Sequence, residues 1–210
     1  MKIGIVGSGN IGATAARLFI KAGHEVAVSN SRGVESLQEL VGELGEKAQA
    51  LRVEDAAKFG EVVLVAIPFG KYKMLPVEPF YGKVVIDAGN YYPQRDGQFA
   101  ELDAGNTTSS ELLETHLRGA RLVKGFNTIY FQHLATQGDV GLPLEDRRVI
   151  FIAGDDSQAK ETVARLIEEI GFAAVDTGFL HEGGKRQQPG TAVYNKELTA
   201  KEAAIILESA

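Results

Sequence analysis

The sequence predicts an α/β protein built on a doubly wound, mostly parallel sheet. Short runs rich in valine, isoleucine and alanine alternate along the chain with longer runs whose apolar residues recur at helical spacing. Val62–Ile67 and Lys83–Asp87 are almost continuously apolar, as parallel strands buried on both faces are. No internal repeat or low-complexity tract interrupts this order, and a repeating strand–helix–strand rhythm is typical of a doubly wound sheet.

The expected strands are short and rich in β-formers. The run Lys2–Val6 opens the chain, the second strand has the sequence EVAVS, and Lys47–Leu51 is the weakest of the set. In chain order the strands are expected at Lys2–Val6, Glu25–Ser29, Lys47–Leu51, Val62–Ile67, Lys83–Asp87, Arg121–Phe126, Arg147–Ala153 and Ala173–Asp176.

The expected helices lie between these strands. In the second of them Leu37, Leu40 and Leu44 fall on one face, which is the pattern of a helix packed on a sheet. In chain order the helices are expected at Ile11–Lys21, Val34–Leu44, Val53–Phe59, Thr107–Leu117, Ser157–Ile170 and Leu198–Leu207.

We expect one domain over residues 1–210, because 210 residues suit one domain and no linker is evident. Within it, residues 1–137 would form a nucleotide-binding core, and residues 138–210 would add a small extension of the sheet and a C-terminal helix. Residues 88–106 and 178–195 are rich in glycine and fit no element. Loops of this length in a compact domain are usually functional or disordered.

Composition excludes several kinds of function. The net charge of −6 gives no broad footprint for nucleic acid. The absence of cysteine rules out disulfides, thiolate nucleophiles and cysteine-ligated metals, and the four histidines show no helical metal-ligand spacing, so no metal site is expected. Redox chemistry would then need a bound organic cofactor. With no signal peptide and no apolar run long enough for a bilayer, we expect a cytoplasmic protein without a membrane partner.

A glycine loop follows the first strand and opens the first helix. Its sequence fits G-x-G-x-x-G, which is weak evidence alone but stronger in this strand–turn–helix context. Gly7 would allow the tight turn, Gly9 would let a diphosphate approach the backbone, and Gly12 would let the helix pack on the sheet. The free N–H groups of the helix start would hold the anion. The expected cofactor contacts are Gly7, Ser8, Gly9, Asn10, Ile11 and Gly12; the alternative is a turn that binds nothing.

The end of the second strand indicates which nicotinamide nucleotide is bound. Proteins that bind NAD place a carboxylate here for the ribose hydroxyls, but this chain has Asn30, Ser31 and Arg32. An arginine can hold a phosphate with two parallel hydrogen bonds. We therefore expect a Rossmann-type fold that binds NADP(H), with Ser31 and Arg32 on the 2′-phosphate; the alternative is a solvated loop.

Ligands of open α/β sheets lie beyond the carboxyl ends of the strands, so the later strand ends are candidates too. Ala66, Ile67 and Pro68 would run beneath the nicotinamide ribose. Asn90 and Asn127 would bind the carboxamide or the second substrate, although loop capping is an equally good interpretation of Asn90.

Several other side chains have a simpler interpretation. Tyr91 and Tyr92 could stack on an aromatic ring, but tyrosines in a loop are as often packing residues. His133 fits a surface or packing position better than a catalytic acid. No side chain is therefore predicted to be catalytic.

These residues carry a family likeness. The motifs are GIVGSGNIG at the start of the chain, the pair Ser31 and Arg32, VAIPFG after the fourth strand and VKGFNTI at Val123–Ile129. Through them the chain resembles the NADP-dependent 8-hydroxy-5-deazaflavin oxidoreductases, and it is also similar to the NADPH-binding domain of the six-transmembrane epithelial antigen metalloreductases. The likeness covers residues 1 to about 180 and is weaker in the second half.

The resemblance implies direct hydride transfer between nicotinamide and a flavin-like ring stacked on it, with no obligatory acid or base. It also implies NADP(H) contacts from residues 8–11, Ser31, Arg32 and Ile67. Departures from the family pattern occur at both ends of the site, at the phosphate (Ser36) and where the second ring should lie (Asn127 and Tyr130). Ser36 replaces a basic residue, and Asn127 and Tyr130 replace a histidine and a proline.

The acceptor therefore stays open at this point. FMN, FAD and a deazaflavin are the expected candidates for a small-molecule electron acceptor. One alternative is a reductase of a small imine or carbonyl compound, and another is an NADP(H) sensor or partner-binding module without turnover. A homodimer is possible, with residues 178–195 and the last helix docking on a second copy.

Overall fold

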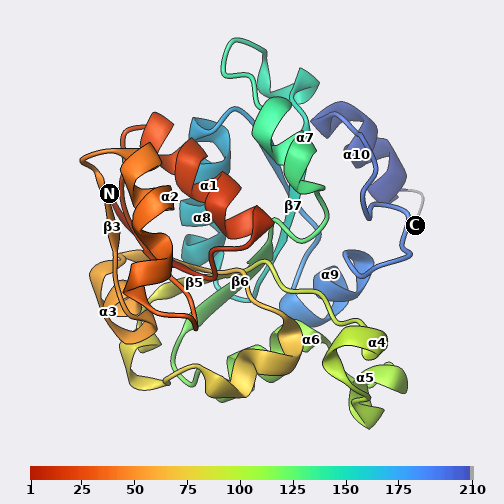
Figure 1. Ribbon diagram of the computed structural model, residues 1–210. Coiled ribbons are helices and arrows are strands. Elements are labelled where there is room, and N and C mark those ends of the chain that lie inside the picture. Colours follow the sequence, from red (N-terminus) through yellow and green to blue (C-terminus); the bar gives the residue numbers. More distant parts are fainter. Residues whose placement is uncertain (209–210) are drawn as a thin grey trace.

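Eight strands form one sheet within residues 1–208, the part of the chain that the computed structural model describes (Figure 1). Their order in the sheet is β3-β2-β1-β4-β5-β6-β7-β8. The bounds are β1 Lys2–Val6, β2 Glu25–Ser29, β3 Ala48–Ala50, β4 Val62–Val65, β5 Val84–Asp87, β6 Arg121–Gly125, β7 Val149–Ala153 and β8 Ala173–Asp176.

The strand directions confirm the predicted doubly wound fold. All pairs from β3 to β6 are parallel, β7 runs antiparallel to β6, and β8 runs parallel to β7. The order reverses between β1 and β4, where Val6 lies beside Val65 at the carboxyl ends of both strands. Ligands of doubly wound sheets bind at such a switch point. The last two strands extend the same sheet, as expected.

Helices cover both faces of the sheet because alternate strand residues point to opposite sides. Ile3 and Ile5 belong to the apolar cluster under α1, α2, α7 and α8, whereas Val63 and Val65 belong to the cluster under α3, α6 and α9. The α-helices are α1 Asn10–Lys21, α2 Gln38–Leu44, α3 Val53–Phe59, α4 Pro93–Asp96, α5 Ala100–Asp103, α6 Ser109–His116, α7 Phe131–Thr136, α8 Ser157–Glu169, α9 Leu180–Arg186 and α10 Ala200–Glu208. Short 3₁₀ turns lie at η1 Val34–Leu37, η2 Phe69–Met74, η3 Glu78–Phe80 and η4 Leu144–Asp146.

Several boundaries differ from the sequence-based expectation. The expected helix 34–44 begins as the 3₁₀ turn η1 and becomes α-helical only at Gln38. β4 ends at Val65, two residues before its apolar run ends, since Ala66 and Ile67 leave the sheet to line a cavity. The last helix begins at Ala200 instead of Leu198, because Leu198 and Thr199 pair with the start of β7.

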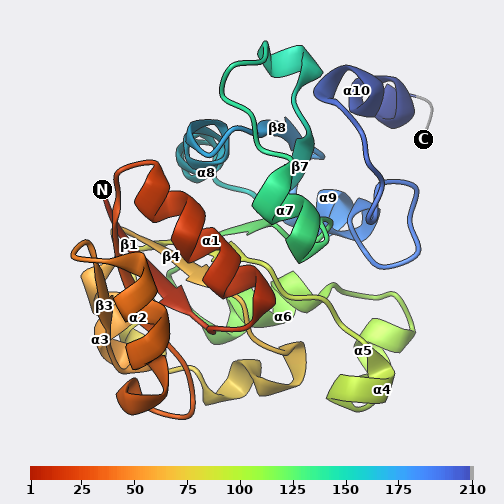
Figure 2. The same cartoon turned by 45° about the horizontal axis from the view of Figure 1, so that its top comes forward.

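The two unassigned stretches contain short helices. Residues 88–106 hold α4 and α5, which form an excursion from the main body of the protein (Figure 2), and residues 178–195 begin with α9. Leu180 of α9 packs in the cluster under α6, which explains why the helix forms despite its two glycines. Within residues 1–208 no helix is long and apolar enough to cross a membrane.

Candidate functional site

The glycine loop joins the ends of three strands. The backbone N–H of Gly7 donates to the carbonyl of Ser29 at 2.9 Å, which ties β1 to the end of β2. Gly7 has a φ of +109°, and a Cβ there would lie 2.2 Å from the carbonyl oxygen of Ala66 beyond β4. Both the backbone conformation and the close approach therefore require glycine at this position.

Gly12 and Gly9 differ in what a side chain would meet. A Cβ on Gly12 would lie 1.8 Å from the carbonyl oxygen of Gly7, so its absence lets α1 pack on the loop. A Cβ on Gly9 would meet no protein atom within 4 Å. The protein itself therefore does not require glycine at position 9, and the open space at that backbone is available to a ligand.

The start of α1 is suited to an anion. Gly9 is its N-cap, no side chain caps the helix, and no acidic residue lies in its first turn. The first N–H groups of a helix have no partner within it, and they carry the positive end of the helix dipole. These donors face the open space beside Gly9, which is the arrangement that binds diphosphates in doubly wound folds.

The loop after β2 is ordered by Asn30. Its Nδ2 donates to the hydroxyls of Ser8 at 3.0 Å and Ser36 at 2.9 Å, and its Oδ1 accepts from the backbone N–H of Arg32 at 2.8 Å. Asn30 therefore connects the glycine loop to the loop that presents Arg32. Ser36 serves as a hydrogen-bond partner of Asn30 at this position.

The guanidinium of Arg32 is exposed and makes no hydrogen bond or ion pair with any residue of the described range 1–208. Ser31 beside it is also exposed. A cation that the protein leaves unpaired next to a cavity is available to a ligand anion, and guanidinium matches phosphate geometry well.

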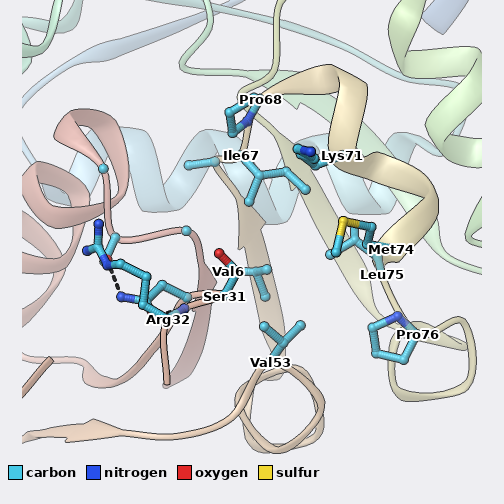
Figure 3. A pocket seen from close by; sticks show the side chains of 15 residues that line it. Val6, Ser31, Arg32, Val53, Ile67, Pro68, Lys71, Met74, Leu75 and Pro76 are labelled. Atoms are coloured by element: carbon cyan, nitrogen blue, oxygen red, sulfur yellow. Dashed lines mark hydrogen bonds between the residues drawn. The ribbon is translucent and has the colours of Figure 1, made fainter. Parts of the chain in front are cut away.

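A cavity of about 670 Å³ lies between these loops (Figure 3). Arg32 lies on one side of it, while Val53, Met74 and Leu75 supply apolar side chains on the other. The cavity is lined by Val6, Gly7, Ser8, Gly9, Asn30, Ser31, Arg32, Val53, Ala66, Ile67, Pro68, Lys71, Met74, Leu75 and Pro76. We call it the adenosine cavity, after the part of NADP(H) that the sequence predicts here; apolar side chains line it and a cation lies beside it.

A second cavity, of about 310 Å³, continues along the strand ends. It shares Gly9, Ala66, Ile67 and Pro68 with the adenosine cavity, so the two form one groove. Its further lining is Asn10, Ile11, Ala88, Gly89, Asn90, Tyr92, Arg95, Phe126, Asn127, Ile129, Tyr130, Phe131, Tyr194 and Asn195. We call it the nicotinamide cavity, after the part of the cofactor that the sequence predicts at these strand ends.

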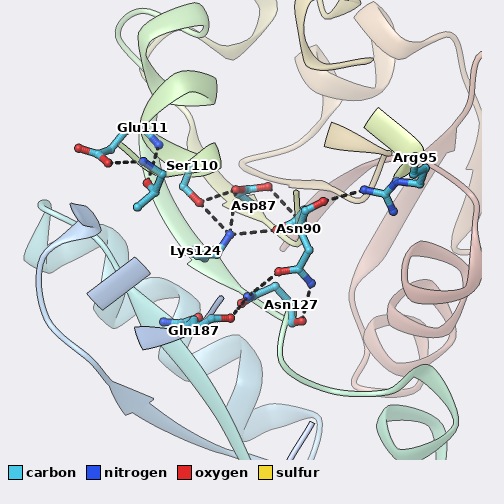
Figure 4. Close-up of polar contacts among 10 residues, drawn as sticks. Asp87, Asn90, Arg95, Ser110, Glu111, Lys124, Asn127 and Gln187 are labelled. Atoms are coloured by element: carbon cyan, nitrogen blue, oxygen red, sulfur yellow. Dashed lines mark hydrogen bonds and ion pairs between the residues drawn. The ribbon is translucent and has the colours of Figure 1, made fainter. Parts of the chain in front are cut away.

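The two asparagines predicted for this end bind each other (Figure 4). Asn90 Nδ2 donates to the backbone carbonyl of Asn127 at 2.8 Å, and Asn127 Nδ2 donates to Asn90 Oδ1 at 3.1 Å and to the carbonyl of Gln187 at 2.9 Å. The loops after β5 and β6 are thus locked together, and residue 187 of the second unassigned stretch joins them.

Asn127 keeps one hydrogen-bonding atom unused. The residue is 4% exposed, and its Oδ1 has no hydrogen-bond partner among residues 1–208. The assignment of oxygen and nitrogen is fixed by the network, because the atom that approaches two acceptor oxygens must be the nitrogen. A buried amide oxygen without a donor costs free energy, so a ligand N–H at the nicotinamide cavity would satisfy it.

Phe126, which precedes Asn127, holds strain at the same place. It is fully buried and has a φ of +64°, a conformation that bulky residues rarely adopt. Such outliers persist where the surrounding structure fixes them and gather at functional sites. Here the turn directs Asn127 toward Asn90.

Aromatic side chains line the part of the nicotinamide cavity where the acceptor would bind, which the sequence did not define. The hydroxyls of Tyr92 and Tyr194 are hydrogen-bonded across the two unassigned stretches. Burial raises the pKa of Tyr194, and this hydrogen bond raises it further. The guanidinium of Arg95 lies over the ring of Tyr92 at 4.9 Å, while Tyr130 and Phe131 line another wall.

The two neighbouring tyrosines of the first stretch have different roles. Tyr91 packs against Phe69 and Phe99 and bonds Asp103, whereas Tyr92 lines the cavity. The packing interpretation is therefore confirmed for Tyr91, whereas stacking of Tyr92 on an aromatic ring stays a prediction. His133 lies outside the nicotinamide cavity, where its ring approaches Tyr130 and Nε2 lies 3.5 Å from Glu197.

The structure thus brings together nearly all the residues predicted to bind the cofactor. Thirteen of the fourteen line the two cavities, and Gly12 lies beneath them as a packing residue. Their contacts with NADP(H) stay a prediction. Tyr194 and Arg95 were missed, since their place in the site depends on loops that sequence patterns did not resolve.

Comparison with known proteins agrees with this geometry. The family model described as "NADP oxidoreductase coenzyme F420-dependent" matches residues 2–91, which include the glycine loop, Arg32 and Asn90. The rat protein "Metalloreductase STEAP3" is 28% identical over 181 residues, which are 85% of this chain and 34% of the relative. The chain therefore spans about a third of the length of this curated relative.

Solved structures extend the similarity to almost the whole chain. A hypothetical protein from Sinorhizobium meliloti is 32% identical, with a TM-score of 0.82 and coverage of 95% of both chains. A structure described as a putative F420-dependent NADP-reductase from Arthrobacter is 24% identical, with a TM-score of 0.75 and coverage of 95% of this chain and 99% of that one; it supports the fold. The N-terminal 2–91 region is thus similar to F420-dependent NADP oxidoreductases, and the solved structures extend the likeness in fold to almost the whole chain.

Proposed function

We propose that this protein binds NADP(H) along the groove and transfers a hydride between the nicotinamide and a flavin or deazaflavin acceptor. One observation carries the proposal: a single groove runs from an unpaired arginine, past an uncapped helix start, to an unsatisfied buried amide oxygen. These three features match, in order, the 2′-phosphate, the diphosphate and the carboxamide of NADP(H).

The adenosine cavity would bind the nucleotide by charge and by shape. Arg32 and Ser31 would hold the 2′-phosphate, and the N–H groups at the start of α1 would hold the diphosphate at the open backbone of Gly9. The loop after β2 carries no carboxylate at positions 30–32, so no side chain there repels the phosphate. This supports a preference for NADP(H) over NAD(H).

The nicotinamide cavity would orient the reactive ring. Bound NADPH supplies the hydride. Asn127 Oδ1 would accept from the carboxamide N–H, and the hydrogen bonds that Asn127 Nδ2 donates to Asn90 and Gln187 fix this side chain. Holding the two reacting partners at near-attack distance, about 3–3.5 Å, is itself a large contribution to the rate.

The acceptor would lie against aromatic side chains. Tyr92, Tyr130, Phe131 and Tyr194 offer flat apolar surfaces, which suit a planar ring system. The family description names coenzyme F420, and this is the support for a deazaflavin. We also propose a cytoplasmic location, in keeping with a cysteine-free sequence.

A binding and turnover screen tests this function. NADPH and NADH are titrated by calorimetry, and NADPH oxidation is then followed with FMN, FAD and the 8-hydroxy-5-deazaflavin as separate acceptors. The proposal expects tighter binding of NADPH than of NADH and steady turnover with at least one of the three acceptors. Tight NADPH binding without turnover on any acceptor would favour a sensor, and no binding of either nucleotide would overturn the proposal.

The tyrosine pair favours a second candidate, a reductase of small imines or carbonyl compounds. Such a reaction needs a proton as well as a hydride, and the hydroxyls of Tyr92 and Tyr194 are proton donors that line the nicotinamide cavity. NADPH oxidation with small cyclic imines and ketones in the same screen separates the two candidates. In this case the Tyr194→Phe variant should lose most of its turnover.

A further inference from the structure

A charged pair is buried at the ends of β5 and β6, beside the nicotinamide cavity. Asp87 and Lys124 are register partners on neighbouring parallel strands and are 4% and 1% exposed. Lys124 Nζ lies 3.4 Å from Asp87 Oδ2. Both side chains point to the face covered by α6 and α9, since Val85 and Leu122 two residues earlier pack in that cluster.

The pair is fully hydrogen-bonded, and one of its partners, Gly89, lines the nicotinamide cavity. Ser110 of α6 donates its hydroxyl to Asp87 Oδ2 at 2.7 Å and accepts from Lys124 Nζ at 2.8 Å. Gly89 is held at both ends: its N–H donates to Asp87 Oδ1 at 2.8 Å, and its carbonyl accepts from Lys124 Nζ at 2.9 Å (Figure 4). The two charges therefore fix both peptide groups of one residue, Gly89, in the loop after β5.

The residue after Gly89 is Asn90. Its side chain binds Asn127 through two hydrogen bonds, and its carbonyl accepts from Arg95 at 2.6 Å. A shift of Gly89 would move Asn90, and with it the amide of Asn127 whose Oδ1 has no partner. The Asp87–Lys124 pair is thus connected to Asn127 Oδ1 first through Gly89 and then through Asn90.

Stability alone is a weak reason for this pair. Replacing a buried ion pair with well-packed apolar residues is often neutral or stabilising, because both charges lose their hydration. What an apolar pair would not supply is a donor for the carbonyl of Gly89 and an acceptor for its N–H. The geometry of the loop is the feature that only the polar pair maintains.

We propose that Asp87, Lys124 and Ser110 are positioning residues that set the Asn90–Asn127 amide pair for the nicotinamide end of the cofactor. The inference rests on the proposed function. It concerns only the nicotinamide half of the groove, so these residues should not affect the adenosine half, which is built by other loops. This selectivity gives the inference a test that loss of stability alone would not pass.

The experiment measures the affinity of the full chain for NADPH and for 2′-phospho-ADP-ribose, which lacks nicotinamide, together with kcat and KM. The main variant combines Asp87→Asn with Lys124→Met, so that no unpaired charge remains buried and the amide oxygen introduced at position 87 can still accept from the N–H of Gly89. Ser110→Ala is a milder second variant. Lys160→Met is the matched control, since Lys160 pairs with Asp176 at 2.7 Å beyond the groove.

In the double variant we expect NADPH affinity to fall about 10-fold and kcat about 10- to 100-fold, because small displacements of reacting groups have effects of that size. Affinity for 2′-phospho-ADP-ribose should stay within 2-fold, roughly the spread of near-neutral changes. Ser110→Ala should show the same selectivity with a smaller loss, and the control should match the wild type.

Two results would overturn the inference. One is a folded double variant with wild-type NADPH affinity and turnover; the other is an equal loss of both ligands, which indicates general destabilisation. If the wild type binds 2′-phospho-ADP-ribose and NADPH equally well, the nicotinamide end is not recognised and the inference fails while the adenosine site stands. If the wild type binds neither, the proposed function itself fails.

Discussion

The adenosine cavity and the nicotinamide cavity share one groove but are constructed differently. The adenosine side is built mostly from short segments that follow neighbouring strands, among them residues 7–9, 30–32 and 66–68. The nicotinamide side combines the ends of β5 and β6 with residues 92, 194 and 195, and the bond between Tyr92 and Tyr194 spans 102 positions. Local motifs define the first, and long-range contacts define the second.

The two sides also differ in how their polar groups are satisfied. Within the described residues 1–208, the guanidinium of Arg32 and the first N–H groups of α1 have no side-chain partner, so the adenosine side presents free donors to an anion. On the nicotinamide side Asn90, Asn127, Lys124 and Asp87 are bound to one another, and one oxygen is left over. The first side should therefore depend on single residues, whereas the second should depend on a network.

The largest expected effect is at Gly9. Gly9→Val places a side chain in open space, so the fold should be kept, but that space is where the diphosphate would approach the helix start. Loss of two charge-assisted hydrogen bonds predicts a drop in NADPH affinity of about 100-fold. Titration calorimetry measures the affinity, and thermal unfolding reports the fold.

Gly12→Ala is the contrasting variant for Gly9. Its Cβ would lie 1.8 Å from the carbonyl oxygen of Gly7, so the melting temperature should fall as well as the affinity. If Gly9→Val binds NADPH like the wild type, the glycine loop is not the diphosphate site.

The next largest effect on affinity concerns the 2′-phosphate that distinguishes NADPH from NADH. Arg32→Ala should weaken NADPH binding by roughly 10- to 100-fold, the size of a charge-assisted hydrogen bond or two, and leave NADH binding almost unchanged. Stability should not change, because the guanidinium has no partner among residues 1–208. Arg52→Ala, an exposed arginine near the start of α3, is the control. Equal losses for both nucleotides would contradict the role of Arg32.

The contrast between the two sides explains what the sequence could predict. A glycine loop between a strand and a helix is a local signal, so the doubly wound fold, the loop of residues 7–12 and the end of the second strand were predicted with nearly correct bounds. The same signals place Ala66, Ile67 and Pro68 in the groove, because a run of apolar residues ends in a proline at the strand end.

The nicotinamide side of the site could not be predicted from local sequence patterns. Residues 88–106 and 178–195 have no periodicity that favours a helix, and α9 forms because Leu180 finds the cluster under α6. Nothing local to Tyr194 or Arg95 indicates that they meet Tyr92. Lys124 belongs to the motif VKGFNTI at Val123–Ile129. A lysine within an otherwise apolar strand is unusual, and this signal could have identified the buried pair.

A smaller effect on turnover is expected from Tyr194→Phe, among the aromatic side chains that line the nicotinamide cavity. Tyr194→Phe keeps the ring and removes the hydroxyl that bonds Tyr92, so the two loops lose one hydrogen bond, worth about 1 kcal/mol. For a flavin or deazaflavin acceptor, kcat/KM should fall only about 3- to 10-fold, with NADPH affinity unchanged. Steady-state kinetics at varied acceptor concentration provide the measurement. A loss near 1,000-fold would instead favour proton donation by the tyrosine.

The smallest expected effect is that of Asp156→Asn, a substitution outside the groove. It tests whether the other variants lose cofactor affinity only because they are less stable. Asp156 caps α8 and accepts two hydrogen bonds from Arg121, at 2.5 and 2.8 Å. Arg121 holds the pKa of Asp156 well below its ordinary value, and the N–H of Ala159 lowers the pKa further. Asp156→Asn keeps a good N-cap and removes the charge, so the loss at pH 7 should not exceed about 1 kcal/mol, the usual limit for exposed pairs.

The pH dependence of this loss has a definite sign. Because the folded pKa is depressed, the contribution of Asp156 is present above the unfolded pKa of about 3.9 and is lost as the pH falls toward the folded value. The stability difference between wild type and Asp156→Asn should therefore be largest near neutral pH and shrink below about pH 4. Denaturant unfolding at several pH values measures it, and a difference that grew toward acid would contradict the pairing with Arg121.

Since neither cavity includes Asp156, NADPH affinity of Asp156→Asn should stay at the wild-type value. A loss of affinity in this variant would mean that the effects at Gly9 and Arg32 report stability rather than contact with the cofactor.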